Sequence, residues 1–143
     1  MIDDGDTLIK LSKGANMGMY AITCIRDKIS NRNLNKVLDI EYSKYNMFNK
    51  LIKVCYRNHE KKDLINKVNK MLKVMISFRI DMKTFNNISI SRLAEILING
   101  TNMGIIEGRK ILNKKDLSID VFKITKKFIE MQEDSVLTLQ KYL

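Results

Sequence analysis

The chain has 143 residues, a formal charge of +10, a single histidine and neither proline nor tryptophan. This length suits one domain that buries its own core, and a hydrophobic share of 45% argues against a disordered chain or a fibre. Because proline is the commonest helix breaker, its absence favours helices. We therefore expect a single all-α domain over 1–143.

The positive charge is spread along the whole chain. Twenty of the 26 basic residues are Lys and six are Arg, and the densest groups are doublets at 61–62 and 126–127. Nucleic-acid-binding segments carry longer basic runs, and Arg is favoured where phosphates are held by two hydrogen bonds. We expect a solvated, lysine-rich surface, which leaves a nucleic-acid partner as a minor alternative.

The start of the chain and its apolar stretches bear on location. Residues 1–6 are acidic and lack the apolar core of a secretory signal. The uncharged apolar stretch 96–106 has 11 residues, whereas a membrane span needs about 20. We expect a cytoplasmic protein without a membrane span. In that compartment Cys24 and Cys55 are expected to be buried thiols and not a disulfide.

Apolar residues at spacings of three and four predict two amphipathic helices in the first sixty residues. The two stripes are Leu8, Leu11, Ala15, Gly18, Ile22, Ile25 and Ile29, and then Leu34, Leu38, Glu41, Tyr45, Phe48, Ile52 and Cys55. A short polar break at 30–33 separates the stripes. A short connection makes neighbouring helices antiparallel, so we expect a helical hairpin over about 6–60.

A further helix is expected over about 62–82, where it would carry the chain back between two hairpins. Its apolar stripe contains three methionines, Met71, Met75 and Met82. Methionine fills adaptable cores and adaptable contact surfaces. This stripe is therefore either core or a self-association face, and a homodimer is a hypothesis.

The last part of the chain predicts a second hairpin over about 91–143. Its first helix is expected over about 92–112, and Ser91 or Ser89 is a suitable N-cap. Its second helix is expected over about 117–142, with Leu117, Val121, Ile124, Phe128 and Met131 on the apolar stripe.

The two hairpins contain an internal repeat. Residues 11–28 and 97–114 align at an offset of 86, and seven of the 18 positions are identical. Both copies carry glycines spaced by four, namely Gly14, Gly18, Gly100, Gly104 and Gly108. Since glycine inside a helix costs about 1 kcal/mol relative to alanine, these residues need a packing reason. We expect the first helices of the two hairpins to cross closely at these helix-packing glycines.

Residues 93–113, LAEILINGTNMGIIEGRKILN, and the QED…L…L…YL ending at 132–143 carry a family resemblance. They resemble ferritin-like helical-bundle proteins of spore-forming bacteria, including bundles of the spore-coat-F type. The resemblance extends more weakly over 11–53. It implies a ferritin-like four-helix bundle built from two repeated hairpins, with an extra crossover helix. It also implies a spore-associated context, and for many members no known activity.

Di-iron proteins of this architecture place Glu on two helices and Glu-x-x-His on the other two. Here the single histidine, His59, stands near a helix end without a Glu three residues before it, and Glu41 is followed by Lys44. We therefore expect no metal and no cofactor. Glu41 and Glu107 are nevertheless expected to face inward at a similar level. They are structural acids, a remnant metal site or part of a ligand pocket.

The sequence contains no nucleophile–histidine pair in a convincing context, so we expect no enzyme. The leading expectation is a structural or protein-interaction role, related to sporulation. The first alternative is a degenerate ferritin-like protein that binds a metal or small ligand with Glu41 and Glu107. The second is a DNA-binding regulator, because the region from Ser89 resembles a helix-turn-helix. That motif needs a turn near Ile98 and a polar recognition helix.

Overall fold

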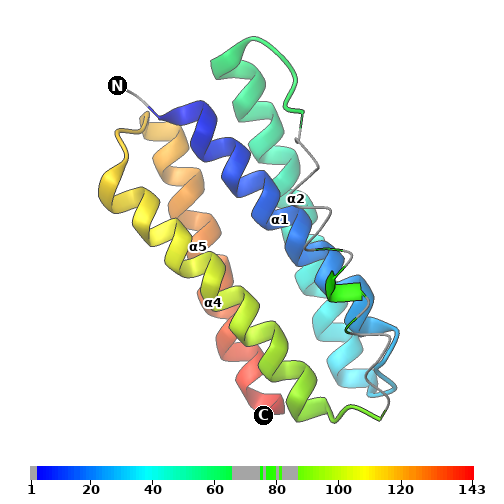
Figure 1. Ribbon diagram of the computed structural model, residues 1–143. Helices are drawn as coiled ribbons and strands as arrows, with labels where there is room; N and C mark the ends of the chain where they lie inside the picture. Colours follow the sequence, from blue (N-terminus) through cyan, green and yellow to red (C-terminus); the bar gives the residue numbers. More distant parts are fainter. Residues whose placement is uncertain (1–2, 66–74, 76, 80, 82–86) are drawn as a thin grey trace.

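The computed structural model describes residues 3–65, 75, 77–79, 81 and 87–143 (Figure 1). Over these residues the secondary structure is helical and no strand is present. The predicted all-α class is confirmed for this part of the chain.

The first pair of helices consists of α1 (Asp4–Arg26) and α2 (Arg32–Glu60). The Asn31 side chain accepts a hydrogen bond from the Leu34 N–H at 3.0 Å. Such a cap satisfies one of the free N–H groups of the first helical turn. Because α2 begins directly after this cap, the second half of the predicted break at 30–33 is helical.

The second pair consists of α4 (Ile90–Lys114) and α5 (Ile119–Leu139), followed by the short 3₁₀ helix η1 (Gln140–Tyr142). Of the two serines considered as the cap of α4, Ser89 is the one used: its side chain accepts a hydrogen bond from the Arg92 N–H at 3.1 Å. Helix α4 therefore extends slightly beyond its predicted span at both ends.

The four long helices share one hydrophobic core. Helix α1 packs mainly on α2, and α4 packs mainly on α5; the two pairs meet through α1 with α4 and α2 with α5. Figure 1 shows the two pairs lying side by side. The start of α1 reaches the turn between α4 and α5, where the Asp3 N–H donates to the Asp116 carbonyl at 2.8 Å.

The predicted apolar stripes point into this core. All seven stripe residues of α2 are buried, from Leu34 to Cys55, and six of the seven at 8–29 are buried. The exception is Gly18, which is half-buried. The periodicity of 3.6 residues per turn was therefore sufficient to find the inner faces of both helices.

The predicted crossover helix at about 62–82 lies largely outside the described residues. Of its described residues, 75, 77–79 and 81 are helical, whereas 62–65 are not, so the helix does not begin at 62 as predicted. Met75 is half-buried, whereas Met71 and Met82, the other methionines of the predicted self-association face, lie outside the described residues.

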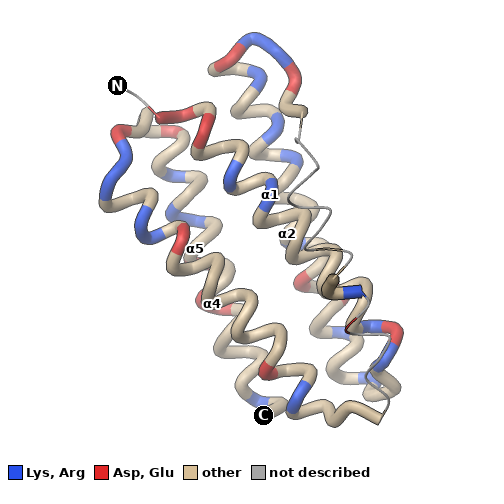
Figure 2. The backbone as a smooth tube through the Cα atoms, in the orientation of Figure 1, with Lys and Arg blue, Asp and Glu red and all other residues tan. Residues whose placement is uncertain are grey.

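Basic residues occur on each of the four long helices, and Figure 2 shows them distributed over the length of the molecule. Some form exposed ion pairs with acids, such as Arg26 with Asp39 at 3.0 Å and Arg109 with Glu133 at 2.7 Å. None of the helices among the described residues contains an apolar segment long enough to cross a membrane.

The helix-turn-helix interpretation requires a turn near Ile98. Helix α4 passes through this residue and through Gly100 without a break. Two glycines of the supposed recognition segment also face protein, because a Cβ at Gly104 would meet the Gln132 side chain of α5 and Gly108 is buried. This region of α4 is therefore not a helix-turn-helix.

Candidate functional site

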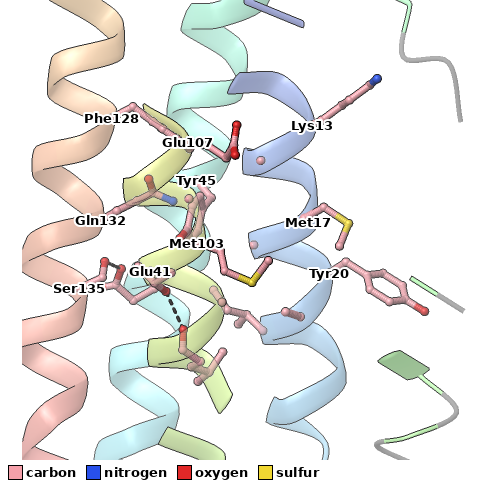
Figure 3. Close-up of a pocket in the computed structure, with 18 of the residues that line it drawn as sticks. Lys13, Met17, Tyr20, Glu41, Tyr45, Met103, Glu107, Phe128, Gln132 and Ser135 are labelled. Atoms are coloured by element: carbon pink, nitrogen blue, oxygen red, sulfur yellow. Dashed lines mark hydrogen bonds between the residues drawn. The ribbon is translucent and has the colours of Figure 1, made fainter. Parts of the chain in front are cut away.

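A cavity of about 600 Å³ lies between the two helix pairs, with α1 and α4 on its opposite sides (Figure 3). Pockets that hold small molecules commonly enclose about 300–1,000 Å³. Its walls are mostly apolar and include Leu11, Met17, Ile22, Leu97, Met103 and Ile111. Both the size and the walls suit a small apolar molecule.

The glycines explain why this space is open. All five glycines of the repeated segments line the cavity. A Cβ at Gly100 would meet no heavy atom within 4 Å, and a Cβ at Gly14 would meet only the Phe128 ring, at 3.8 Å. At Gly100, which is exposed, and at Gly14, which is half-buried, the absence of a side chain leaves open space beside the cavity.

Other glycines of the same faces make room for bulky neighbours. A Cβ at Gly18 would lie 2.7 Å from the Tyr45 ring of α2, and a Cβ at Gly104 would overlap the Gln132 amide of α5. The atoms nearest to these glycines thus belong to α2 and α5. The predicted close crossing of α1 and α4 at the glycines needs correction: side chains from the other helices and a cavity occupy the space between the two glycine faces.

Glu41 lies on the inner face of α2 and lines the cavity, at 4% exposure. Its carboxylate accepts a hydrogen bond from the Ser135 hydroxyl of α5. The Lys44 ammonium lies 3.7 Å from Glu41 Oε1. Because a buried carboxylate is unfavourable without such partners, Ser135 and Lys44 explain how α2 can hold an acid in its core stripe.

Glu107 does not join Glu41 in the interior. Its side chain is 64% exposed at the rim of the cavity, and its Oε1 lies 3.8 Å from Lys110 Nζ. The prediction of an inward-facing Glu41 and Glu107 pair is therefore wrong. Each residue of a helix is rotated by about 100° from the next, so Glu107 lies at the border of the α4 face on which its neighbour Gly108 is buried.

The polar part of the cavity wall also includes Tyr45, Thr101 and Gln132, all of which are buried. Burial raises the pKa of the Tyr45 phenol; hydrogen bonds with Gln132 and Thr101 oppose the rise, and the charge of Glu41 adds to it. Gln132 is 3% exposed, and its Oε1 has no hydrogen-bond partner among the described residues. Leaving a buried carbonyl unpaired costs about 1–3 kcal/mol, so Gln132, a residue that lines the cavity, holds an unused acceptor.

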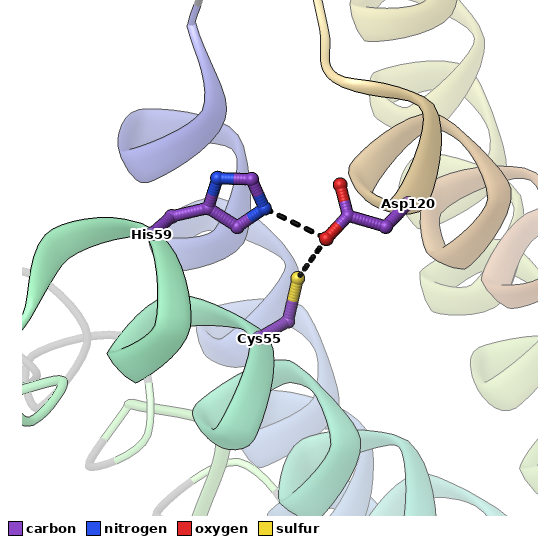
Figure 4. A group of neighbouring side chains, drawn as sticks. All are labelled: Cys55, His59 and Asp120. Atoms are coloured by element: carbon purple, nitrogen blue, oxygen red, sulfur yellow. Dashed lines mark hydrogen bonds and ion pairs between the residues drawn. The ribbon is translucent and has the colours of Figure 1, made fainter.

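A second polar group lies where the end of α2 meets the start of α5 (Figure 4). His59 Nε2 is 2.7 Å from Asp120 Oδ2, and the Cys55 thiol donates to the same oxygen with a separation of 3.6 Å. One sulfur, one nitrogen and one oxygen atom of these residues all lie within 4.8 Å of one another. We call Cys55, His59 and Asp120 the α2–α5 cluster.

Asp4 of α1 contacts the α2–α5 cluster through His59, on the ring nitrogen that does not face Asp120. Its Oδ2 lies 3.4 Å from His59 Nδ1. The same carboxylate accepts hydrogen bonds from the Ser118 N–H at 2.8 Å and the Ser118 hydroxyl at 2.5 Å. Asp4 is 6% exposed. It therefore joins the start of α1, the imidazole of α2 and the N-cap of α5.

The α2–α5 cluster does not have the geometry of a catalytic thiol. Burial, followed by the negative charges of Asp120 and Asp4, raises the pKa of the Cys55 thiol to about 11. Such a thiol is protonated at neutral pH, whereas reactive cysteines have lowered pKa values. Cys55 and His59 both contact Asp120 Oδ2, so the histidine is not inserted between an acid and the thiol as a general base.

The α2–α5 cluster was not predicted from the sequence. Cys55 and His59 are four residues apart on α2. This spacing is visible in the sequence and places both residues on one face of the helix. Asp120 is distant in sequence, and only the packing of α5 on α2 brings it to the other two. Cys24 and Cys55 are both free thiols; Cys55 is buried as predicted, whereas Cys24 is only half-buried.

The comparisons with known proteins add no assignment to either site. No protein-family model, no curated protein and no solved structure matches the chain. The functions of the cavity and of the α2–α5 cluster must therefore be argued from their own chemistry.

Proposed function

We propose that the chain is a non-enzymatic protein that binds a small, largely apolar molecule in the cavity between α1 and α4. One observation carries this proposal: an apolar cavity of about 600 Å³ is lined by Gln132, whose buried carbonyl oxygen, Oε1, has no hydrogen-bond partner among the described residues. An apolar body would fill the space that the glycines leave open, and a donor on the ligand would satisfy the carbonyl.

The polar wall also selects the charge of the ligand. Glu41 lines the cavity and is buried. A ligand carboxylate would bring a second negative charge into the same low-dielectric space, and such like charges repel. Beside Glu41 the ligand head is therefore a neutral or cationic donor, such as a hydroxyl, an amide or an amine; the lysines that line the cavity, Lys10 and Lys13, lie on α1.

The test is a displacement titration with an environment-sensitive apolar dye. Three competitors of equal chain length are compared: a primary alcohol, an alkane and a fatty acid. We expect the alcohol to displace the dye most strongly, because its hydroxyl donates to Gln132 Oε1, and we expect the acid to be the weakest. One hydrogen bond of about 1–1.5 kcal/mol corresponds to about tenfold in affinity.

A matched pair of variants isolates the carbonyl. Gln132→Met keeps the size of the side chain but removes the acceptor, so the alcohol should lose its advantage over the alkane. Gln140→Met makes the same exchange at an exposed position and should leave both affinities unchanged. The absence of saturable dye binding, or an unchanged preference for the alcohol in Gln132→Met, would refute the proposal.

We also propose that the helices form a ferritin-like bundle of two duplicated hairpins joined by a crossover helix. In support, each copy of the repeat starts seven residues into the first helix of its pair, at residue 11 for α1 and residue 97 for α4. The resemblance of 93–113 supports a sporulation-related role. Quantitative mass spectrometry of purified spores and growing cells of the source organism tests this: equal amounts in both would contradict it.

One observation favours a protein-interaction role as a second candidate. Four apolar residues of α2 share its outer face and are between 48% and 60% exposed, namely Ile40, Met47, Leu51 and Val54. The predicted homodimer stays a prediction, and this face is the described surface on which to test it. Light scattering of wild type and Leu51→Lys should show a dimer that the substitution dissociates; a wild-type monomer at high concentration would contradict it.

A further inference from the structure

The α2–α5 cluster combines three donor types that bind zinc. Thiolate sulfur, imidazole nitrogen and carboxylate oxygen are the usual protein ligands of Zn²⁺. Ligand atoms at about 2.0–2.3 Å from one tetrahedral ion lie about 3–4 Å from each other, and the atoms of Cys55, His59 and Asp120 already lie within 4.8 Å of one another. We propose that Cys55, His59 and Asp120 bind a divalent transition-metal ion, with Zn²⁺ as the preferred ion.

The surrounding contacts orient the imidazole for this role. Histidines that bind a metal through one ring nitrogen commonly donate the other N–H to a carboxylate, which fixes the ring. His59 Nε2 faces the cluster, while Nδ1 lies 3.4 Å from Asp4 Oδ2. Asp4 is itself held by two hydrogen bonds from Ser118. This supporting carboxylate is an observation independent of the three ligands.

The charge and the exposure of the cluster suit an open zinc site. Binding replaces the Cys55 S–H bond by a sulfur–metal bond and releases the proton to solvent. The thiolate and the Asp120 carboxylate then balance the charge of the ion. The Asp120 side chain is 59% exposed and that of His59 is 24% exposed, so the ion is reached from solvent, and a water molecule completes a four-coordinate shell.

The composition of the cluster argues against calcium and magnesium. Calcium and magnesium prefer six or more oxygen ligands, whereas this cluster offers one carboxylate beside sulfur and nitrogen. The cluster is also separate from the cavity, because Cys55 lies ten residues beyond Tyr45 on α2, or about 15 Å along the helix. The metal proposal and the ligand proposal can therefore fail independently.

The test uses the reduced, full-length chain, freed of metal by a chelator and titrated with Co²⁺. We expect saturation at one equivalent, with a near-ultraviolet sulfur-to-cobalt charge-transfer band and the visible bands of four-coordinate Co²⁺. Zn²⁺ should displace the cobalt and abolish both. The wild-type melting temperature should also rise with Zn²⁺ and not with Mg²⁺.

Two cysteine variants identify the sulfur ligand. Cys55→Ser should lose the charge-transfer band, whereas Cys24→Ser should keep it and bind with wild-type affinity. Circular dichroism checks that each variant is folded.

The other ligands are tested in the same titration. His59→Gln and Asp120→Asn should each weaken Co²⁺ binding at least tenfold, while Asp134→Asn, an exposed acid on the same helix, should not. Asp4→Asn should weaken binding about 10–100-fold and retain the band, since it orients a ligand without being one.

The proposal is overturned if wild type shows neither the cobalt bands nor a rise in melting temperature with Zn²⁺. It is also overturned if the charge-transfer band survives in Cys55→Ser or is lost in Cys24→Ser. The wild-type measurements decide the question even if a variant fails to fold.

Discussion

The cavity and the α2–α5 cluster are built in opposite ways. In the cavity, glycines on α1 and α4 leave space, and a buried carbonyl of Gln132 has no partner among the described residues. At the end of α2, polar side chains from three helices contact one another, and Asp4 binds both His59 and Ser118. The two helix pairs are therefore joined by polar contacts at one end, whereas glycines leave open space between α1 and α4 in the middle.

The largest expected effect on stability comes from removing the polar contacts of Asp4. Asp4→Ala removes the acceptor of two Ser118 hydrogen bonds and the partner of His59. Hydrogen bonds to charged groups contribute about 1.5–3 kcal/mol each, and together we expect a loss of about 3 kcal/mol in the free energy of unfolding. Urea denaturation measures it.

Asp6→Ala is the control for this substitution. Both acids lie in the first turn of α1, but Asp6 is exposed. It should therefore lose only the interaction with the helix dipole, about 0.3–1 kcal/mol. Equal losses of the free energy of unfolding in the two variants would show that the Asp4 contacts with α2 and α5 do not stabilise the fold.

Smaller effects on stability are expected from alanine at two of the glycines, one in tight contact with a neighbour and one beside open space. Gly18→Ala brings a Cβ to 2.7 Å from the buried Tyr45 ring, and such overpacking costs about 1–3 kcal/mol. Gly100→Ala meets no atom within 4 Å and gains about 1 kcal/mol of helix propensity. Denaturation curves should move in opposite directions for the two variants; a shift in the same direction would contradict the described packing.

The smallest effect concerns the polar wall of the cavity. Tyr45→Phe removes a hydroxyl that hydrogen-bonds with Gln132 and Thr101, and should cost about 1 kcal/mol. Because burial raises the pKa of this phenol in the folded protein, the unfolded chain ionises first as pH rises past its ordinary value of about 10. The wild-type advantage over Tyr45→Phe should therefore be complete below pH 10 and shrink above it. An advantage that grows above pH 10 would be inconsistent with a buried, neutral phenol.

Helical periodicity predicted the core well, because the spacing of residues along a single helix decides which of them share a face. The stripe from Leu34 to Cys55 depends on the turn of one helix, so all its residues could be placed from spacing alone. Glu41 was placed inward by the same rule. Glu107 was misplaced because it lies at the border of the inner face of α4, where the packing of neighbouring helices decides exposure.

What the glycines do could not be read from spacing. The repeat marked Gly14 and Gly100 as special, but whether a small residue allows close contact or leaves a cavity depends on which side chains other helices supply. Here Tyr45 and Gln132 fill some of the space and nothing within 4 Å fills the rest at Gly100. The α2–α5 cluster shows the same limit, because Asp120 joins Cys55 and His59 only through the fold.

The central claim is that the glycine-lined cavity is a binding site, and filling it tests this most directly. Gly100→Leu adds a side chain at an exposed glycine that lines the cavity and has no atom within 4 Å of the added Cβ, while Asn102→Leu adds the same side chain at an exposed position of α4 outside the lining. The binding of the apolar dye and the melting temperature are measured together. We expect Gly100→Leu to melt at or above the wild-type temperature and to bind the dye at least tenfold more weakly, with Asn102→Leu binding like wild type. Wild-type affinity in a folded Gly100→Leu protein would contradict the claim.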